Sequence, residues 1–148
     1  MDLILWRHAD AEDGGPDLER QLTKAGRKQA ARVAAWLRER LPGEFEVVSS
    51  PAARALQTAE CLKKKPRIDK TLAPGASPAA ILKAAGWPGA EGSVVLVGHQ
   101  PDFGRALAHL LAGASGGWSI KKGGLWWLTN EKEEKQVQVR AVISPDLL

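Results

Sequence analysis

LILWRHAD, residues 3–10, joins a short apolar run to an arginine–histidine pair. An apolar run of this length, bounded by polar residues, is typical of a fully buried strand. Arg7 and His8 then stand where the strand ends, which is where open α/β sheets bind their ligands. Because an arginine can grip an anion and a histidine can attack it, the pair indicates phosphoryl chemistry at this end of the strand.

The composition predicts one domain, 1–148, because 148 residues with 44% hydrophobic side chains suffice for a single core. The longest apolar runs are strand-sized, well short of the roughly 20 residues of a membrane span. No basic flank or small-residue cleavage site of a secretory signal precedes the first strand. The single cysteine, Cys61, excludes an internal disulfide. We therefore expect a cytoplasmic protein that does not associate with membranes.

The net charge of +4 is too mild to predict a nucleic-acid binder. Basic residues nevertheless gather at Lys63–Lys65 with Arg67, and at Lys121 with Lys122. The favoured interpretation is a helix C-terminus for the first group and a solvated turn for the second. The alternative is a docking surface for an acidic partner protein.

Strands and helices alternate along the chain. Strands are predicted at 3–7, 45–49, 67–71, 93–97, 125–128 and 137–143, the last two as a hairpin around the polar turn 130–135. Helices are predicted at 24–40 with Thr23 as its cap, from Ser50–Pro51 to about Lys64, at 79–85 after Ser77–Pro78, and at 101–112. This order predicts an α/β three-layer sandwich: a mostly parallel central sheet flanked by helices, with a C-terminal antiparallel hairpin at one edge. Alternation in 137–143 predicts that Val137, Val139, Ala141 and Ile143 share one face, the other being solvated.

Three strand ends of the predicted sheet bring polar residues to the same edge. Arg7 and His8 follow the first strand, Ser50 and Arg54 follow the second, and Gly98 and His99 follow the apolar strand 93–97. Two arginines and two histidines at one edge predict an anion pocket that contains a nucleophile.

His8 is the candidate nucleophile: a neutral imidazole, oriented by an N–H bond from its other nitrogen to a carbonyl, that attacks phosphorus in line. The alternative is a core histidine satisfied by the backbone. Arg7 and Arg54 are candidates for a bidentate clamp on phosphoryl oxygens, Arg54 from the first turn of a helix, whose N–H groups already favour an anion. The alternative for both is an ordinary surface charge.

His99 is the candidate for stabilising charge on the equatorial oxygens, as a cation or a hydrogen-bond donor. Gly98 before it would let the backbone approach the ligand. Arg20 either reaches back to this pocket or is solvated, with no preference between the two. His109, near the end of a predicted helix, is interpreted as structural.

Three segments in this order resemble the histidine phosphatase superfamily, and more closely its small SixA-type phosphohistidine phosphatases. They are Arg7-His8, the segment SPAARALQTA at 50–59, and VGHQPD at 97–102. The pattern of Asp17, Arg20, Leu22, Thr23 and Gly26 is also similar to that group. The resemblance covers nearly the whole chain.

The resemblance implies a phosphoglycerate mutase-like fold in which His8 is the phosphorylated nucleophile. Arg7, Arg54 and His99 would form the phosphate pocket for a phosphate or other oxyanion, with Arg20 as a supporting contact. No metal and no organic cofactor are implied. The chain departs from the family at Ala9, where a glycine is usual; the alanine would add a methyl group near the pocket.

A second departure is the short segment between Lys65 and Gly92, whose only acidic residues are Asp69 and Glu91. We therefore expect no cap over the site, although larger relatives carry an acidic proton donor there. An open pocket can admit a side chain of another protein, and a phosphohistidine has a leaving imidazole that is easily protonated. Asp10 and Glu12 are the candidates for a proton donor; the alternative for them is loop solvation or a contact at a helix start.

The favoured function is a metal-independent phosphatase acting on phosphohistidine in a protein, as in a phosphorelay or other phosphotransfer component of signal transduction. A small-molecule phosphomonoesterase is the alternative enzyme, and a phosphate-binding or interaction module without turnover is the alternative outside enzymes. A metal hydrolase using His8, His99 and Asp10 is disfavoured, because the histidines lack helical spacing and the arginines would oppose a cation.

Six tryptophans are interpreted mainly as packing residues. Trp118, Trp126 and Trp127 could instead mark a partner surface.

Overall fold

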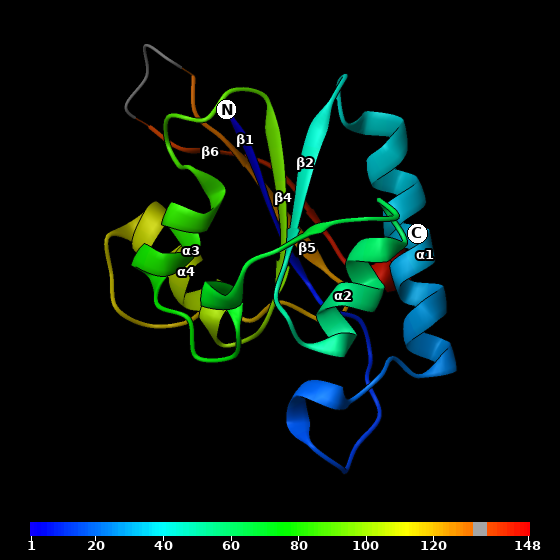
Figure 1. Cartoon of the computed structure of the whole chain (residues 1–148). Coiled ribbons are helices and arrows are strands. Elements are labelled where there is room, and N and C mark those ends of the chain that lie inside the picture. Colours follow the sequence, from blue (N-terminus) through cyan, green and yellow to red (C-terminus); the bar gives the residue numbers. More distant parts are fainter. Residues whose placement is uncertain (132–135) are drawn as a thin grey trace.

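Six strands form one central sheet, and helices cover both of its faces (Figure 1). The computed structural model describes residues 1–131 and 136–148. The strands are β1 (Asp2–Arg7), β2 (Phe45–Ser49), β3 (Arg67–Ile68), β4 (Ser93–Gly98), β5 (Leu125–Thr129) and β6 (Gln138–Ile143). The α-helices are α1 (Lys24–Arg40), α2 (Ala53–Glu60), α3 (Pro78–Ala85) and α4 (Asp102–Ala112), with 3-10 turns η1 (Asp17–Glu19), η2 (Lys70–Leu72) and η3 (Pro145–Leu147).

The sheet has the order β3-β2-β4-β1-β5-β6. The strands β3, β2, β4 and β1 run parallel to one another. β5 pairs antiparallel with β1, and β6 pairs antiparallel with β5. The prediction of a mostly parallel sheet with an antiparallel hairpin at one edge is therefore confirmed. Residues 132–135 of the predicted hairpin turn lie outside the described residues.

β1 is buried on both faces, as its unbroken apolar sequence predicts. Ile4 and Trp6 pack in the core under α1 and α2, and Leu3 and Leu5 pack in the core under α3 and α4. Figure 1 shows these two helix pairs on opposite sides of the sheet. The predicted three-layer sandwich is confirmed. In the described part of the chain, no helix combines the length and the apolar character that crossing a membrane requires.

Two of the predicted helix starts are confirmed. Thr23 accepts a hydrogen bond from Gly26 N at 2.9 Å, and Ser77 accepts one from Ala80 N at 3.1 Å. The predicted start at Ser50 is wrong, because α2 begins only at Ala53. This helix also ends at Glu60 and not near Lys64.

The lysines at 63–65 follow the end of α2, and Lys63 N donates to the carbonyl of Ala59 in its last turn at 3.1 Å, which agrees with their interpretation as a helix C-terminus. The segment from 65 to 92 contains β3, η2 and α3. Its Leu72, Ile81 and Ala85 pack in the core beside α4. The segment thus covers the sheet and adds no separate cap, as expected.

The prediction of one apolar face for 137–143 is wrong, because a β-bulge interrupts the pairing of β5 with β6. Trp127 pairs with Ala141, but the adjacent Leu128 pairs with Val139. Since an extra residue in a strand reverses the facing of all residues beyond it, Val137 packs toward the α3 and α4 side, whereas Ala141 and Ile143 pack toward the α1 and α2 side. Val139 is 46% exposed.

Candidate active site

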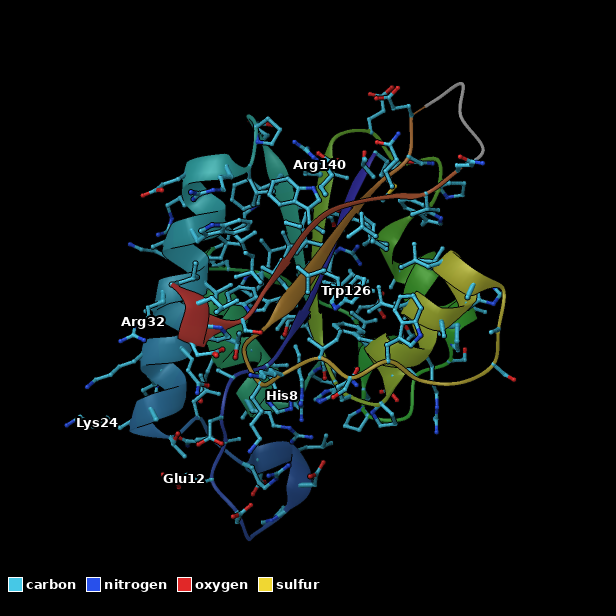
Figure 2. The ribbon with its side chains drawn as sticks, turned by 180° about the vertical axis from the view of Figure 1, so that it is seen from behind. His8, Glu12, Lys24, Arg32, Trp126 and Arg140 are labelled. Carbon is cyan, nitrogen blue, oxygen red and sulfur yellow. The ribbon has the colours of Figure 1, made fainter. Side chains whose placement is uncertain are left out.

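The parallel pairing of β1, β4 and β2 brings three strand ends together. Arg7 pairs with Gly98, and Ser49 pairs with Val97. His8 N then donates to the carbonyl of Gly98 at 3.0 Å, which continues the ladder one residue beyond β1. As a result the rings of His8 and His99 lie with their centroids 5.3 Å apart. Figure 2 shows His8 at this end of the sheet, with Glu12 farther out in the following loop.

The imidazole of His8 has a defined orientation. Its Nδ1 lies 2.8 Å from the carbonyl oxygen of Ala9. Because a carbonyl only accepts hydrogen bonds, Nδ1 carries the proton of the neutral ring. Its Nε2 lies 3.3 Å from Arg54 Nε, which donates to it. The lone pair for a nucleophilic attack is therefore on Nε2, next to a guanidinium.

Burial, together with the weaker effect of the charges of Arg54, Arg7 and Arg20, lowers the pKa of His8 to about 4. The hydrogen bond to the Ala9 carbonyl acts in the opposite direction. His8 is only 8% exposed. It is therefore neutral at physiological pH, as a nucleophilic imidazole must be.

Arg54 lies in the first turn of α2 and is buried. Its Nη1 donates to the carbonyl of Asp17 at 2.7 Å, and its Nη2 lies 3.2 Å from the Asp17 carboxylate. Arg20 contacts the other oxygen of that carboxylate through Nε at 3.2 Å, and its Nη1 donates to the carbonyl of Glu12. Arg20 thus reaches back to the edge of the pocket. The carboxylate of Asp17 joins the two arginines. The sequence singled out Asp17 only as part of the pattern that resembles the family.

His99 is almost fully buried, and its Nε2 lies 2.7 Å from the hydroxyl of Ser50. Its Nδ1 is buried and has no hydrogen-bond partner among the described residues. Burial, followed by the nearby His8 and Arg54, lowers the pKa of His99 to about 3. His99 is therefore a neutral hydrogen-bonding group in this state. Sequence patterns assigned Ser50 to helix capping and missed its contact with His99.

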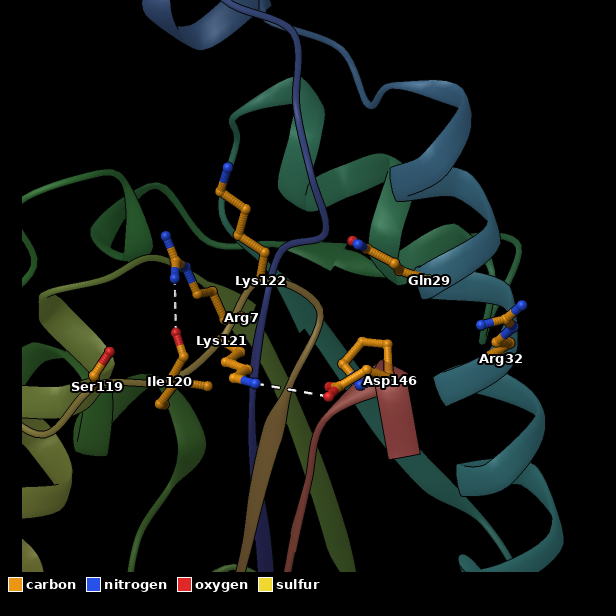
Figure 3. Close-up of a pocket in the computed structure, with 9 residues that line it drawn as sticks. Arg7, Gln29, Arg32, Ser119, Ile120, Lys121, Lys122 and Asp146 are labelled. Atoms are coloured by element: carbon orange, nitrogen blue, oxygen red, sulfur yellow. Dashed lines mark hydrogen bonds and ion pairs between the residues drawn. The ribbon is translucent and has the colours of Figure 1, made fainter. Parts of the chain in front are cut away.

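Arg7 extends from the end of β1 into a cavity of about 640 Å³ (Figure 3). Its Nη1 donates to the carbonyl of Ile120 at 2.7 Å. Its Nε is buried and has no partner in the described ranges. The loop before β5 thus fixes the position of the Arg7 guanidinium through Nη1.

The two proton-donor candidates lie in the loop after His8. The carboxylate of Asp10 is 2.9 Å from Lys122 Nζ and accepts a hydrogen bond from the Thr23 hydroxyl at 2.8 Å. These two contacts lower the pKa of Asp10 below its ordinary value, so it is ionised at neutral pH and is a poor proton donor. Glu12 is exposed, and its backbone bonds to Gln21 and Arg20.

Two small residues near the site have structural roles. The methyl group expected near the pocket at Ala9 is buried and packs in the core with Leu22 and Ala30. A Cβ on Gly98 would lie 2.7 Å from the ring of Phe103. The packing of Phe103 thus requires a residue without a side chain at position 98. The expectation was a different reason for this glycine, namely that it would let the backbone approach a ligand.

Other singled-out residues lie away from this chemistry. The carboxylate of Asp102 is buried and accepts hydrogen bonds from Gly75 N and Ala76 N, and His109 is exposed on α4. Trp127 is buried, which excludes it from a partner surface. Trp118, 38% exposed, packs on Trp126 with ring centroids 5.4 Å apart.

Within residues 1–131 and 136–148, no three histidine, cysteine or acidic side chains gather as metal ligands.

Solved structures share this architecture. The protein histidine phosphatase SixA, solved with tungstate, matches with a TM-score of 0.80 at 24% identity, over 99% of each chain. A phosphoserine phosphatase mutant of Entamoeba histolytica matches with a TM-score of 0.73 at 16% identity, over 99% of this chain and 98% of that one. A mycobacterial glucosyl-3-phosphoglycerate phosphatase matches with a TM-score of 0.71 at 23% identity, over 97% and 98%. These matches establish the phosphoglycerate mutase-like fold.

Sequence relatives extend the match. An uncharacterized protein of Picosynechococcus sp. is 36% identical over 137 residues, which cover 84% of this chain and 82% of the relative. An uncharacterized protein of Mycobacterium tuberculosis is 35% identical over 114 residues, 74% of this chain and 72% of the relative. The family model for the histidine phosphatase superfamily (branch 1) matches residues 3–76, which include Arg7, His8 and Arg54. The chain belongs to the histidine phosphatase superfamily.

Proposed function

We propose that the protein is a metal-independent phosphatase that acts through a phosphohistidine on His8 and removes phosphate from phosphohistidine side chains of other proteins. The observation that carries this proposal is the orientation of His8. Its Nδ1 is tied to the Ala9 carbonyl, and its neutral Nε2 lies beside Arg54. A basic nitrogen and a guanidinium at one point are the two groups that phosphoryl transfer to nitrogen requires.

The reaction has two steps. In the first, the Nε2 lone pair of His8 attacks phosphorus, the bond from phosphorus to the leaving group breaks, and the leaving group takes a proton from solvent water. Arg7, Arg54 and the ring of His99 stabilise the charge on the equatorial oxygens. In the second, water attacks the phosphorus, the bond from phosphorus to Nε2 breaks, and His8 and orthophosphate are released. The arginines supply the positive charge that a metal ion supplies in other phosphatases.

The state of the acidic groups supports phosphohistidine as the substrate. Asp10, two residues after His8, and Asp17, which contacts Arg54, both have pKa values lowered by cationic or hydrogen-bonding partners. Ionised carboxylates are poor proton donors, so an alkoxide leaving group would depart slowly. An imidazole leaves with much less help, because it is far less basic than an alkoxide.

A small-molecule phosphate ester is the second candidate. It is favoured by the cavity of about 640 Å³ beside Arg7, because cavities of roughly 300 to 1,000 Å³ are the usual size of small-molecule sites. The same His8 and arginines would serve this reaction.

Phosphate release from a phosphohistidine-bearing phosphotransfer domain, measured beside a panel of common phosphate esters, tests the proposal. We expect faster release from the phosphohistidine protein, no release by His8→Ala, and unchanged release by His109→Ala, a matched change of an exposed histidine. The wild type should also form an acid-labile, base-stable phospho-enzyme. Failure of every substrate to phosphorylate His8 would favour a binding module, and preference for an ester would favour the second candidate.

A further inference from the structure

The cavity beside Arg7 is strongly cationic. Four of its nine lining residues are basic, namely Arg7, Arg32, Lys121 and Lys122, and Asp146 is its only acidic one. Figure 3 shows that these side chains come from the end of β1, from α1 and from the loop before β5. Neither the family motifs nor the two-step reaction accounts for Arg32 and the two lysines.

The positive charge of the cavity is poorly compensated. In the described part of the chain no carboxylate lies within ion-pairing distance of the exposed Arg32. Lys121 lies 3.6 Å from Asp146, but both side chains are more than half exposed. Lys122 lies 2.9 Å from Asp10 and is likewise more than half exposed. Exposed ion pairs of this kind are weak and exchange partners easily.

Arg7 connects the cavity to the proposed phosphate pocket. It lines the cavity, and its charge contributes to the low pKa of His8. Its bond to the Ile120 carbonyl fixes the guanidinium, and its buried Nε has no partner among the described residues. A phosphoryl group on His8 and an anion in the cavity would therefore be neighbours on either side of one arginine.

We propose that this cavity binds a carboxylate of the substrate, and that for a phosphohistidine protein this is an aspartate or glutamate side chain close to the phosphohistidine. The inference rests on the proposed function. Both lysines already pair with carboxylates, Lys121 with Asp146 and Lys122 with Asp10, so a carboxylate is an anion that fits them. The substrate carboxylate would take over Lys121 from Asp146 and would also meet Arg32.

The first test compares kcat/KM for two phosphohistidine peptides that differ only in having glutamate or glutamine beside the phosphohistidine. We expect the wild type to prefer the glutamate peptide about fivefold, the gain of one or two partly exposed ion pairs. In the double variant Arg32→Gln with Lys121→Gln the ratio should fall to about one. The matched control is Lys83→Gln with Arg105→Gln, which removes the same charge from exposed positions on α3 and α4 and should keep the ratio.

The second test needs no turnover. Calorimetry compares a carboxyalkylphosphonate with the alkylphosphonate of equal chain length, and the carboxylate should strengthen binding to the wild type about fivefold but not to the double variant. If this preference appears and no phosphohistidine peptide is hydrolysed, the carboxylate site stands, its source is a small molecule, and the phosphohistidine proposal fails. If peptides are hydrolysed at equal rates and both phosphonates bind equally, the carboxylate site is refuted and the phosphatase proposal stands.

Discussion

Mild acidification should destabilise this protein through His8 and His99. Both are buried, with folded pKa values of about 4 and about 3. In the unfolded chain a histidine has a pKa of about 6.5. Between these values the unfolded state binds more protons than the folded state. Stability is therefore fully present above pH 6.5 and is lost as the pH falls toward the folded pKa values.

The size of the effect follows from the two pKa values of each histidine. Lowering the pH from 7 to 5 protonates each histidine almost completely in the unfolded chain, but only to a small extent in the folded protein. This difference costs about 2 kcal/mol for each histidine, and about 4 kcal/mol for the two together. A single domain is commonly stable by about 5 to 15 kcal/mol, so the loss is large. The pKa values of Asp10 and Asp17 are also lowered in the folded protein. Their contribution to stability is lost only at lower pH, as the pH falls below the unfolded value near 3.8.

Urea unfolding at pH 7 and at pH 5, in buffers without phosphate, measures this loss. Phosphate must be absent because a ligand of the folded state would add its own stabilisation. The variant His8→Gln should lose about 2 kcal/mol less than the wild type between the two pH values. The control His109→Gln changes an exposed histidine and should behave like the wild type. An equal loss in His8→Gln and the wild type would show that His8 titrates normally, and would refute the argument for a neutral nucleophile.

Three substitutions probe the site and its support. Arg54→Lys keeps the charge but loses the planar fork, so kcat/KM for phosphate release should fall about 100-fold; a fall below about threefold would exclude a bidentate role. Ser50→Ala removes the 2.7 Å contact with His99 Nε2, and steady-state kinetics should show kcat about tenfold lower with KM nearly unchanged. Gly98→Ala places a Cβ 2.7 Å from the Phe103 ring, and urea unfolding should show a loss of about 1 to 3 kcal/mol that Phe103→Leu partly restores.

The parts of the fold that local sequence determines could be predicted. The apolar run of β1 is buried on both faces, and the hydroxyls of Thr23 and Ser77 cap the helices that follow them. Parallel strands end at one edge, so Arg7, His8 and His99 could be placed together without any knowledge of their contacts. These inferences needed only spacing and residue type.

The remaining features depend on contacts between distant segments. Ser50 has the residue type of a helix cap, but its hydroxyl meets His99, 49 positions away, at the end of a neighbouring strand. The bulge in β6 follows from its pairing with β5 and leaves no mark in the alternation of 137–143. The methyl of Ala9 faces the core because α1 and α2 close over it. In each case the tertiary partner overrides the local pattern.

In the proposed reaction, one set of charges serves both the nucleophile and the phosphate. Arg54, Arg7 and Arg20 each disfavour a proton on His8, and a neutral His8 is the form that attacks. The same arginines attract the phosphoryl group. Once bound, its negative charge would raise the pKa of His8 and of His99, and so would oppose the effect of the arginines. The carboxylate of Asp17 contacts both Arg54 and Arg20 and is 59% exposed. In the proposed reaction the phosphoryl group would displace this carboxylate and would meet arginines whose positions are already fixed by other contacts.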